Sequence, residues 1–343
     1  MTSRRLPLAT PAPDGVERET SRSVSHGSHP HWLLTLPMML TSGGLITLQA
    51  QVNGALAHRL GTGLRASALA AVISFGSGLV VLTLFALVNR PMGRGIIELG
   101  HAVAQRRVPL WLVLGGLGGA FFVASQGLAA GRMGITFFVI CFVAGQAVMA
   151  LLVDHQGWGP NGPTGLSAGR VVGAALAVVA VAISGAGVAA AVPVTLLFLL
   201  VAALPLVAGL LNSLQQGVNG RLSARFGSWV TTWNNFFVGT LGLTLFLAAT
   251  LVLPGRLVGL PREGWLYLGG LCGIGFIWAS AVAVRIHGVL VVGVFAVAGQ
   301  VVTAALISLV SASGAPPLTT WLAALTSLLS AAVVGLSQRA RPR

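Results

Sequence analysis

The sequence predicts an all-α integral membrane protein with ten transmembrane helices, arranged as two inverted five-helix repeats. Of the 343 residues, 55% are hydrophobic and only 8% are charged, whereas a soluble domain carries about 25% charged residues. The apolar stretches are long enough to cross a bilayer, which takes about 20 residues. Two of them contain nearly the same polar string, LQAQVNG at 48–54 and LQQGVNG at 214–220.

The first 31 residues differ in composition from the rest of the chain. They are rich in proline, serine and arginine, which is typical of disorder. We predict a disordered cytoplasmic tail over 1–31 rather than a signal peptide, because the polar region is too long and the next apolar run exceeds a signal core. Its histidines, His26, His29 and His31, have no cysteine or acid to complete a metal set.

Arginine, proline and glycine divide the remaining sequence into ten expected spans. These spans cover 33–56, 67–88, 110–130, 133–153, 170–190, 193–217, 229–253, 264–284, 288–311 and 317–337. We expect the first repeat over 32–190, the second over 191–337 and a short basic C-terminal tail over 338–343. The longest loop between spans is 89–109.

The arginines predict the orientation of the chain. All 20 cations are arginines. With a cytoplasmic N-terminus, 15 of them lie in the two terminal tails and in the segments between spans on the cytoplasmic side, and 5 lie in segments on the outer side. Cytoplasmic loops are enriched in this way, so we expect both termini in the cytoplasm. The net charge of +14 is scattered between apolar blocks, so we expect the lipid bilayer, and no nucleic acid, as its partner.

The repeat extends beyond the two amide strings. Residues 48–61 match 214–227 at an offset of 166, and WLVLGGLGGAFF at 111–122 matches WLYLGGLCGIGF at 265–276 at an offset of 154. The string VAGQ recurs at 143–146 and 297–300. Because each repeat has five spans, the second enters the membrane from the opposite face, an architecture typical of secondary transporters.

These strings also resemble a known family. QAQVNGALAHRLG and LQQGVNGRLSARFG are similar to the Q-x-x-x-N-G-x-L opening of the YdcZ family, an EamA-like family of the drug/metabolite transporter superfamily. AGQAVMALLVDHQGWGP at 144–160 resembles the region between its fourth and fifth spans. The resemblance covers about 33–337 and implies a ten-helix inner-membrane carrier of small metabolites, but it supplies no substrate and no catalytic residues.

Uncharged amides are the candidate binding residues. At 100° per residue, Gln49 and Asn53 share one face of the first span, and Gln51 points the other way. One wedge of the sixth span carries a larger set, consisting of Asn212, Gln215, Gln216 and Asn219. Amides donate and accept hydrogen bonds, so these faces suit a path for polar solutes. Hydrogen bonding between helices is the alternative, and each Asn-Gly pair also suits a helix C-cap.

Further candidates lie in other spans. Gln146 and Gln300 occupy matching positions in the two VAGQ strings and are our second choice for the substrate path, while Gln126 is weaker because its counterpart is Ser280. Pro37 and Pro205 precede the amide strings and predict kinks that act as hinges or only aid packing. The pairs Gly115/Gly119 and Gly269/Gly273 have a spacing that allows close packing within the bundle or in a homodimer.

Ionisable groups are nearly absent from the spans. Only Asp154 lies near one, and with His155 it forms a possible proton relay or an interfacial cap. No embedded carboxylate is available for proton-coupled export of cations. The two cysteines, Cys141 and Cys272, are far apart, so we expect no metal site and no cofactor.

The sequence therefore favours a secondary transporter of a small polar or amphipathic metabolite, working by alternating access. The alternative is a non-transporting scaffold or partner subunit, although the short loops offer little surface for partners. We do not expect an enzyme, because no catalytic triad, acid pair or phosphate loop is present.

Overall fold

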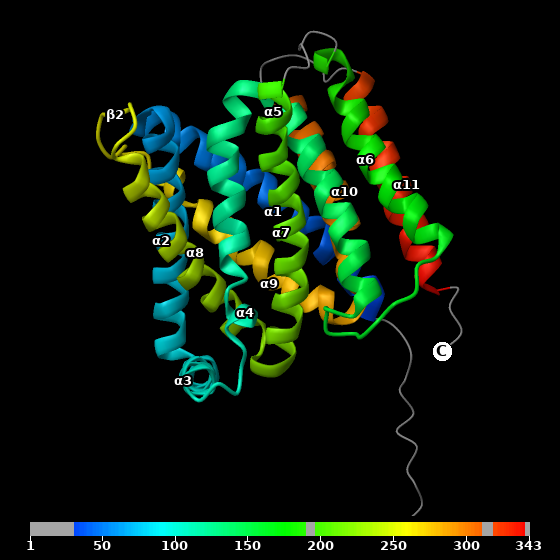
Figure 1. The fold of residues 1–343 in the computed structure, drawn as a ribbon, viewed down its shortest axis with the longest axis horizontal. Helices are drawn as coiled ribbons and strands as arrows, with labels where there is room; N and C mark the ends of the chain where they lie inside the picture. Colours follow the sequence, from blue (N-terminus) through cyan, green and yellow to red (C-terminus); the bar gives the residue numbers. More distant parts are fainter. Residues whose placement is uncertain (1–30, 190–195, 311–317, 340–343) are drawn as a thin grey trace, which may run out of the picture.

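The computed structural model of the chain describes residues 31–189, 196–310 and 318–339. The predicted N-terminal tail, apart from His31, lies outside the described residues, as do the boundary expected near 190 and residues 340–343 of the basic C-terminal tail. The described chain is almost entirely helical, and its long helices run side by side as a bundle (Figure 1).

Helical residues coincide with each expected span. The helices are α1 (His31–Leu60), α2 (Gly63–Val88), α3 (Arg90–Ala104), α4 (Leu110–Val113), α5 (Gly116–Gln156), α6 (Ala168–Ala189), α7 (Leu196–Phe226), α8 (Ser228–Thr250), the 3-10 turn η1 (Gly264–Tyr267), α9 (Gly269–His287), α10 (Val289–Val310) and α11 (Leu318–Arg339). Two short strands, β1 (Gly61–Thr62) and β2 (Arg256–Leu257), pair antiparallel.

Six helical stretches of the described chain are long and apolar enough to cross a membrane. They are Gly63–Val88, Phe138–Gln156, Leu199–Phe226, Gly264–His287, Val289–Ile307 and Leu318–Ser337. Apolar side chains remain exposed along their outer faces, as Leu84 and Leu325 illustrate. A soluble protein covers most of its large apolar surface, so the prediction of an all-α membrane protein is confirmed.

Helix α5 covers two of the expected spans and folds back on itself. A straight helix rises about 1.5 Å per residue, which would separate Phe122 from Phe142 by about 30 Å. Their ring centroids are instead 4.7 Å apart, and those of Phe122 and Phe138 are 5.9 Å apart. The chain therefore reverses between Phe122 and Phe138, and the two arms of α5 lie against each other.

The segment expected to be the longest loop, 89–109, instead contains helix α3, so that expectation was wrong. Asn89 caps the helix by accepting a hydrogen bond from the Met92 backbone amide at 3.0 Å. Met92, Leu99 and Ala102 are buried against the bundle, and the remaining faces carry polar residues. Such a one-sided helix is too weakly apolar to stand out as a span, and it lies across the ends of the long helices (Figure 1).

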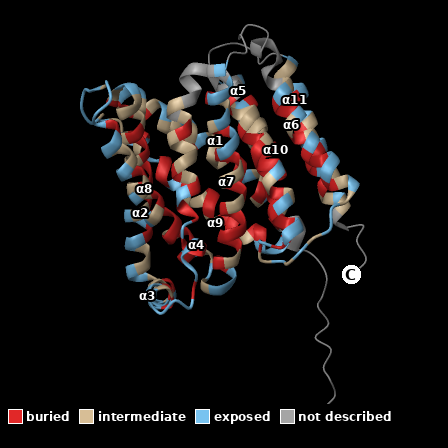
Figure 2. Cartoon of the chain, viewed as in Figure 1, coloured by how far each residue is buried: buried red, intermediate tan, exposed pale blue. Residues whose placement is uncertain are grey.

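Buried residues lie where the long helices meet (Figure 2). One core cluster joins α5, α6 and α10, and a second joins α2, α3, α8 and α9. Helix α1 packs against α9 and α10, and α7 packs against α5 and α9. The central helices α1 and α7 thus connect the two clusters and carry most of the predicted amides.

Candidate functional site

A cavity of about 670 Å³ lies between α1, α2, α5, α6, α10 and α11. Its wall on α1 runs from Ile46 to Ala57, in the half of α1 that leads to β1, and its wall on α2 begins four residues after that helix starts. We call the end of the bundle with β1 and β2 the ribbon end, and the end with α3 and residues 157–167 the α3 end (Figure 1). The cavity belongs to the ribbon end.

The cavity wall is apolar with a few uncharged polar groups. Phe122, Phe138 and Phe142 form an aromatic surface on the two arms of α5. The polar lining residues are Thr47, Gln51, Asn53, Ser67, Gln126, Gln300 and Thr320. None of the described residues that line the cavity is charged. Within this described part of the wall an ion would find no opposite charge, whereas an uncharged amphipathic molecule would meet both apolar and hydrogen-bonding groups.

Only some of the predicted amides line the cavity. Asn53 and Gln300 line it. Gln51, expected to point away from the path, also lines it, because the cavity meets the face of α1 that carries Thr47, Ala50 and Gln51. Gln49 is 9% exposed and lies against Gly273 of α9 instead. Sequence periodicity separated Gln49 from Gln51 correctly, but it could not identify which of the two faces adjoins open space.

Several predicted amides of α7 hold helices together. The Nε2 of Gln215 donates to the Oδ1 of Asn235 at 2.9 Å, and the Nδ2 of Asn235 donates to the Oδ1 of Asn219 at 2.6 Å. Asn212 is buried close by on the same wedge. Asn235 is not among the residues predicted from the sequence, although the Asn234-Asn235 pair inside an apolar span was a signal for it. Both Asn53 and Asn219 lie inside long helices, so the C-cap interpretation of the Asn-Gly pairs was wrong.

The first repeat lacks this network. Asn53 corresponds to Asn219. Ser74 takes the place of Asn235, because Gly270 packs on Ser74 as its counterpart Gly116 packs on Asn235, and the serine side chain is too short to bridge two amides. The Oδ1 of Asn53 and the Oγ of Ser74 have no hydrogen-bond partner. Asn53 is therefore free of the interhelical role that Asn219 performs, and it borders the cavity.

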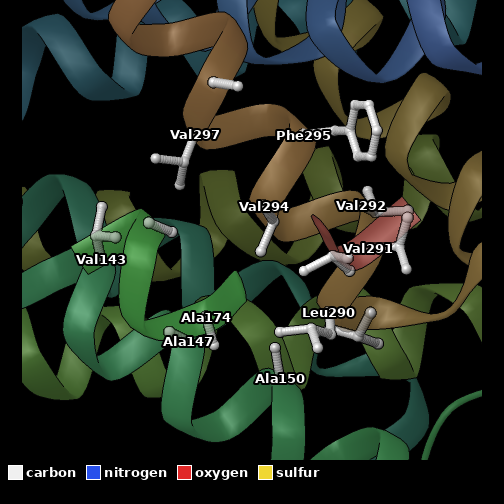
Figure 3. Packing of buried hydrophobic residues seen from close by; sticks show 14 of the residues in the cluster. Val143, Ala147, Ala150, Ala174, Leu290, Val291, Val292, Val294, Phe295 and Val297 are labelled. Atoms are coloured by element: carbon white, nitrogen blue, oxygen red, sulfur yellow. The ribbon is translucent and has the colours of Figure 1, made fainter. Parts of the chain in front are cut away.

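A second and much smaller space lies at the α3 end. It is a void of about 10 Å³ between α5, α6 and α10, lined by Gln146, Leu290 and small side chains such as Ala147 and Ala150. Figure 3 shows Leu290, Ala147 and Ala150 among the packed hydrophobic residues of this region. The Oε1 of Gln146 has no hydrogen-bond partner, and both polar atoms of the buried Gln216 side chain also lack one. Gln146 and Gln216 are thus buried amides without the bonds that such groups normally make.

Asp154 ties three helices together at the α3 end. Its carboxylate pairs with Arg170 at the start of α6, and its two oxygens accept hydrogen bonds from the backbone amides of Val289 and Leu290 at 2.8 and 3.0 Å. Asp154 is 5% exposed and Arg170 is 3% exposed. We call Asp154, Arg170 and the first turn of α10 the latch. His155, the other residue of the predicted relay, is exposed.

The loop after α5 adds further bonds to the closed end. Arg221 on α7 donates to the carbonyl oxygens of Gly157 and Gly159 at 2.6 and 3.1 Å, and the side chain of Asn161 donates to the carbonyl of Val284 at 3.3 Å. Gly157 has a φ of 68°, which favours glycine at this helix end. The α3 end is therefore closed by ionic and backbone contacts that bridge α5, α6, α7, α9 and α10.

The predicted prolines and glycine pairs lie within the bundle. Pro37 is inside α1 and Pro205 is inside α7, and helix continues on both sides of each. Gly115 lies against Asn219, and Gly119 lies near Gln215. Gly269 and Gly273 lie against Asn53 and Gln49 in the same way. These glycines let the helices approach the amides closely, as the packing interpretation of their spacing predicts.

Contacts in one half of the chain recur in the other half. A Cβ added to Gly43 would overlap the carbonyl oxygen of Ala296, and one added to Gly209 would overlap that of Phe142. The residue pairs differ by the offsets of the sequence repeat, 166 and 154. The same offsets relate the contact of Gly299 with Leu40 to that of Gly145 with Leu206. They also relate the bond from Thr47 to the Gln300 carbonyl to the bond from Ser213 to the Gln146 carbonyl. The contact of Gly270 with Ser74 resembles that of Gly116 with Asn235, although Ser74 and Asn235 differ by 161 positions.

Comparison with known proteins agrees with these observations. The profile of a family described as "Putative inner membrane exporter, YdcZ" matches residues 34–183 and 200–336. A solved structure titled only "Crystal structure of protein" aligns over 89% of this chain and 96% of its own, with a TM-score of 0.63 and 17% identity. This likeness shows a shared fold. A search of curated proteins gives no match.

Proposed function

The chain belongs to the YdcZ family of the drug/metabolite transporter superfamily, and from this we propose that it is a secondary transporter that carries a small amphipathic metabolite across the bacterial inner membrane by alternating access. The observation that carries the proposal is the 670 Å³ cavity at one end of a bundle whose other end is closed. The family description is that of a transporter and not of an enzyme.

The recurring contacts support two inverted five-helix repeats and ten crossings. The pair α1 and α10 meets at Gly43 and Gly299, and the pair α7 and α5 meets at Gly209 and Gly145 in the corresponding way. Such related contacts arise when two homologous units pack about a pseudo-two-fold axis. In this arrangement α2 packs on its counterpart α8, and α6 packs on its counterpart α11.

The arginine distribution supports an orientation with both termini in the cytoplasm. The α3 end then faces the cytoplasm, because α3 carries Arg90 and Arg94 and is followed by Arg106 and Arg107. The cavity would accordingly face the outside, and the latch would close the cytoplasmic side. The bonds of Asp154 and Arg221 support this closure, because separating α5 from α10 requires that they break.

The chemistry of the wall favours an uncharged solute. Gln51, Asn53 and Gln300 offer hydrogen bonds, while the phenylalanines offer apolar contact. A cavity of this volume is typical of sites for small organic molecules. A membrane-embedded ion without a partner is strongly disfavoured, so the proposal extends to net-uncharged amphipathic molecules and does not include cationic drugs.

Transport by purified protein in liposomes tests this proposal. A metabolite library is first screened for solutes that raise the melting temperature, and the hits are then assayed for uptake. We expect Asn53→Ala combined with Gln300→Ala to abolish uptake while the protein remains folded. Thr326→Ala is the control, because this exposed hydroxyl bonds only within its own helix. Uptake that survives the double substitution would show that the cavity is not the path, and a library without any transported solute would favour the scaffold alternative.

A further inference from the structure

The small void at the α3 end is related to the cavity by the sequence repeat. Val297, Gln300 and Val301 line the cavity, and the residues 154 positions earlier, Val143, Gln146 and Ala147, line the void. The same offset of 154 relates Val139 of the first repeat, which lines the cavity, to Gly293 of the second repeat, which lines the void. The two spaces therefore occupy equivalent places in the two halves of the chain.

Val143 and Val297 line both spaces. They are counterparts of each other at the offset of 154, and both are buried. They thus lie between the large cavity and the small void. The void measures about 10 Å³, which is at the lower limit for holding one water molecule.

Two buried amides, Gln146 at the void and Gln216 on α7, have unused hydrogen-bonding groups. Gln146, which lines the void, has an unpartnered Oε1 and is 4% exposed, and Gln216 has unpartnered Nε2 and Oε1 atoms and is 3% exposed. Their counterparts, Gln300 and Ala50, line the open cavity. Buried amides without partners destabilise the state that contains them. Gln146 and Gln216 would therefore gain hydrogen bonds in a state in which the void is wider.

We infer that the void is a latent solute-binding site, the α3-end equivalent of the cavity, and that Gln146 and Gln216 bind an uncharged hydrogen-bonding solute there when the latch opens. This inference rests on the proposed function. Gln51 has no equivalent in the latent site, because its counterpart is Gly217, where a Cβ would lie 2.7 Å from Val153. The two sites therefore share the pair Gln300/Gln146 but differ at the position of Gln51.

The latch determines whether the latent site is accessible. Asp154 holds the first turn of α10, and further along this helix Gly293 and Val294 line the void. Movement of this end of α10 away from α5 would open the void toward residues 157–167. Because the carboxylate bonds α10 directly, its loss removes the main polar obstacle to that movement.

Cysteine labelling tests the latent site in the full-length protein. Cys141 and Cys272 are first replaced by alanine, and single reporters are then placed by Val301→Cys in the cavity and by Ala147→Cys in the void. These two positions are repeat counterparts, so each controls for the other. A small charged thiol reagent that does not cross the membrane is added to one side of reconstituted vesicles at a time.

We expect Val301→Cys to react from the ribbon side and Ala147→Cys to react slowly from the α3 side. Asp154→Asn should raise the second rate about tenfold, which corresponds to about 1.4 kcal/mol. If Ala147→Cys stays unreactive in both backgrounds while Val301→Cys reacts, the latent site is refuted and the proposed cavity stands. If Val301→Cys itself is unreactive, the proposed cavity fails and the latent site fails with it.

A pair of adjacent substitutions provides a test that does not depend on the reporters. Gln216→Leu removes an amide without partners, whereas Gln215→Leu removes one that is bonded to Asn235. We expect Gln216→Leu to raise the melting temperature and to reduce labelling of Ala147→Cys from the α3 side, and Gln215→Leu to lower the melting temperature. Equal losses of melting temperature in both variants would overturn the role of Gln216.

Discussion

Asp154 and Arg170 form an ion pair in which both side chains are almost completely buried, at 5% and 4% exposure. The pair joins the end of α5 to the start of α6, and the same carboxylate bonds two backbone amides of α10. A buried charge is tolerated only when it is paired and hydrogen-bonded. Asp154 meets this condition, which explains how a buried acid at the end of a span can be accommodated.

Removing one partner of this pair should destabilise the protein. Arg170→Leu leaves the Asp154 carboxylate buried without its counter-charge, and breaking a buried pair in this way costs about 3–5 kcal/mol. We expect a large fall in the melting temperature in detergent. Arg170→Leu combined with Asp154→Leu should recover part of the loss, because no charge is then left buried. A double variant that melts below the single variant would contradict this account.

The glycines at the helix crossings should be sensitive to a single methyl group. A Cβ at Gly43 or Gly209 would overlap a backbone carbonyl of the neighbouring helix, and the backbone cannot move away as a flexible side chain can. We expect Gly43→Ala and Gly209→Ala each to lower the melting temperature, by similar amounts, because their contacts are related by the repeat.

Gly76→Ala is the matched control for these two variants. Gly76 lies in α2, and a Cβ there would meet nothing within 4 Å. This substitution should leave the melting temperature unchanged or raise it slightly, since alanine favours helix over glycine. Comparable losses at Gly76 and Gly209 would indicate that helix propensity, and not the crossing, decides the effect.

Asn235 should matter more than its counterpart Ser74. The Asn235 side chain bonds both Gln215 and Asn219, whereas the Ser74 hydroxyl has no partner. Asn235→Ala leaves two buried amides without a bond, at a cost of about 1–3 kcal/mol each, although bonds between helices in membranes average about 0.6 kcal/mol. Thermal unfolding of Asn235→Ala and Ser74→Ala should therefore show a clear loss only for the first.

The proposed orientation can be tested with reporter fusions. A domain that is active only in the cytoplasm, fused after Arg343, should be active if both termini lie inside. The same domain inserted at Gly259, between β2 and η1, should be inactive, because this exposed loop belongs to the ribbon end. Activity at Gly259 together with inactivity after Arg343 would reverse the orientation and would place the cavity on the cytoplasmic side.

Local sequence determined the helices of this protein. Apolar stretches of about 20 residues form helices in a membrane because no other local structure satisfies their backbone groups there. Helix α3 was not predicted, because its apolar face is narrow and arginines interrupt it. The repeat was also readable, because shared amides, tryptophans and arginines in one order do not arise by chance in apolar helices.

Tertiary structure alone decided what each amide does. Gln49 and Gln51 are equally polar and lie two residues apart, yet one packs on Gly273 and the other lines the cavity. Gln215 and Gln216 are adjacent, yet only the first meets Asn235. A helical sequence fixes the angles between its side chains, but the neighbouring helices fix which angle faces a partner and which faces open space, and those neighbours come from distant parts of the chain.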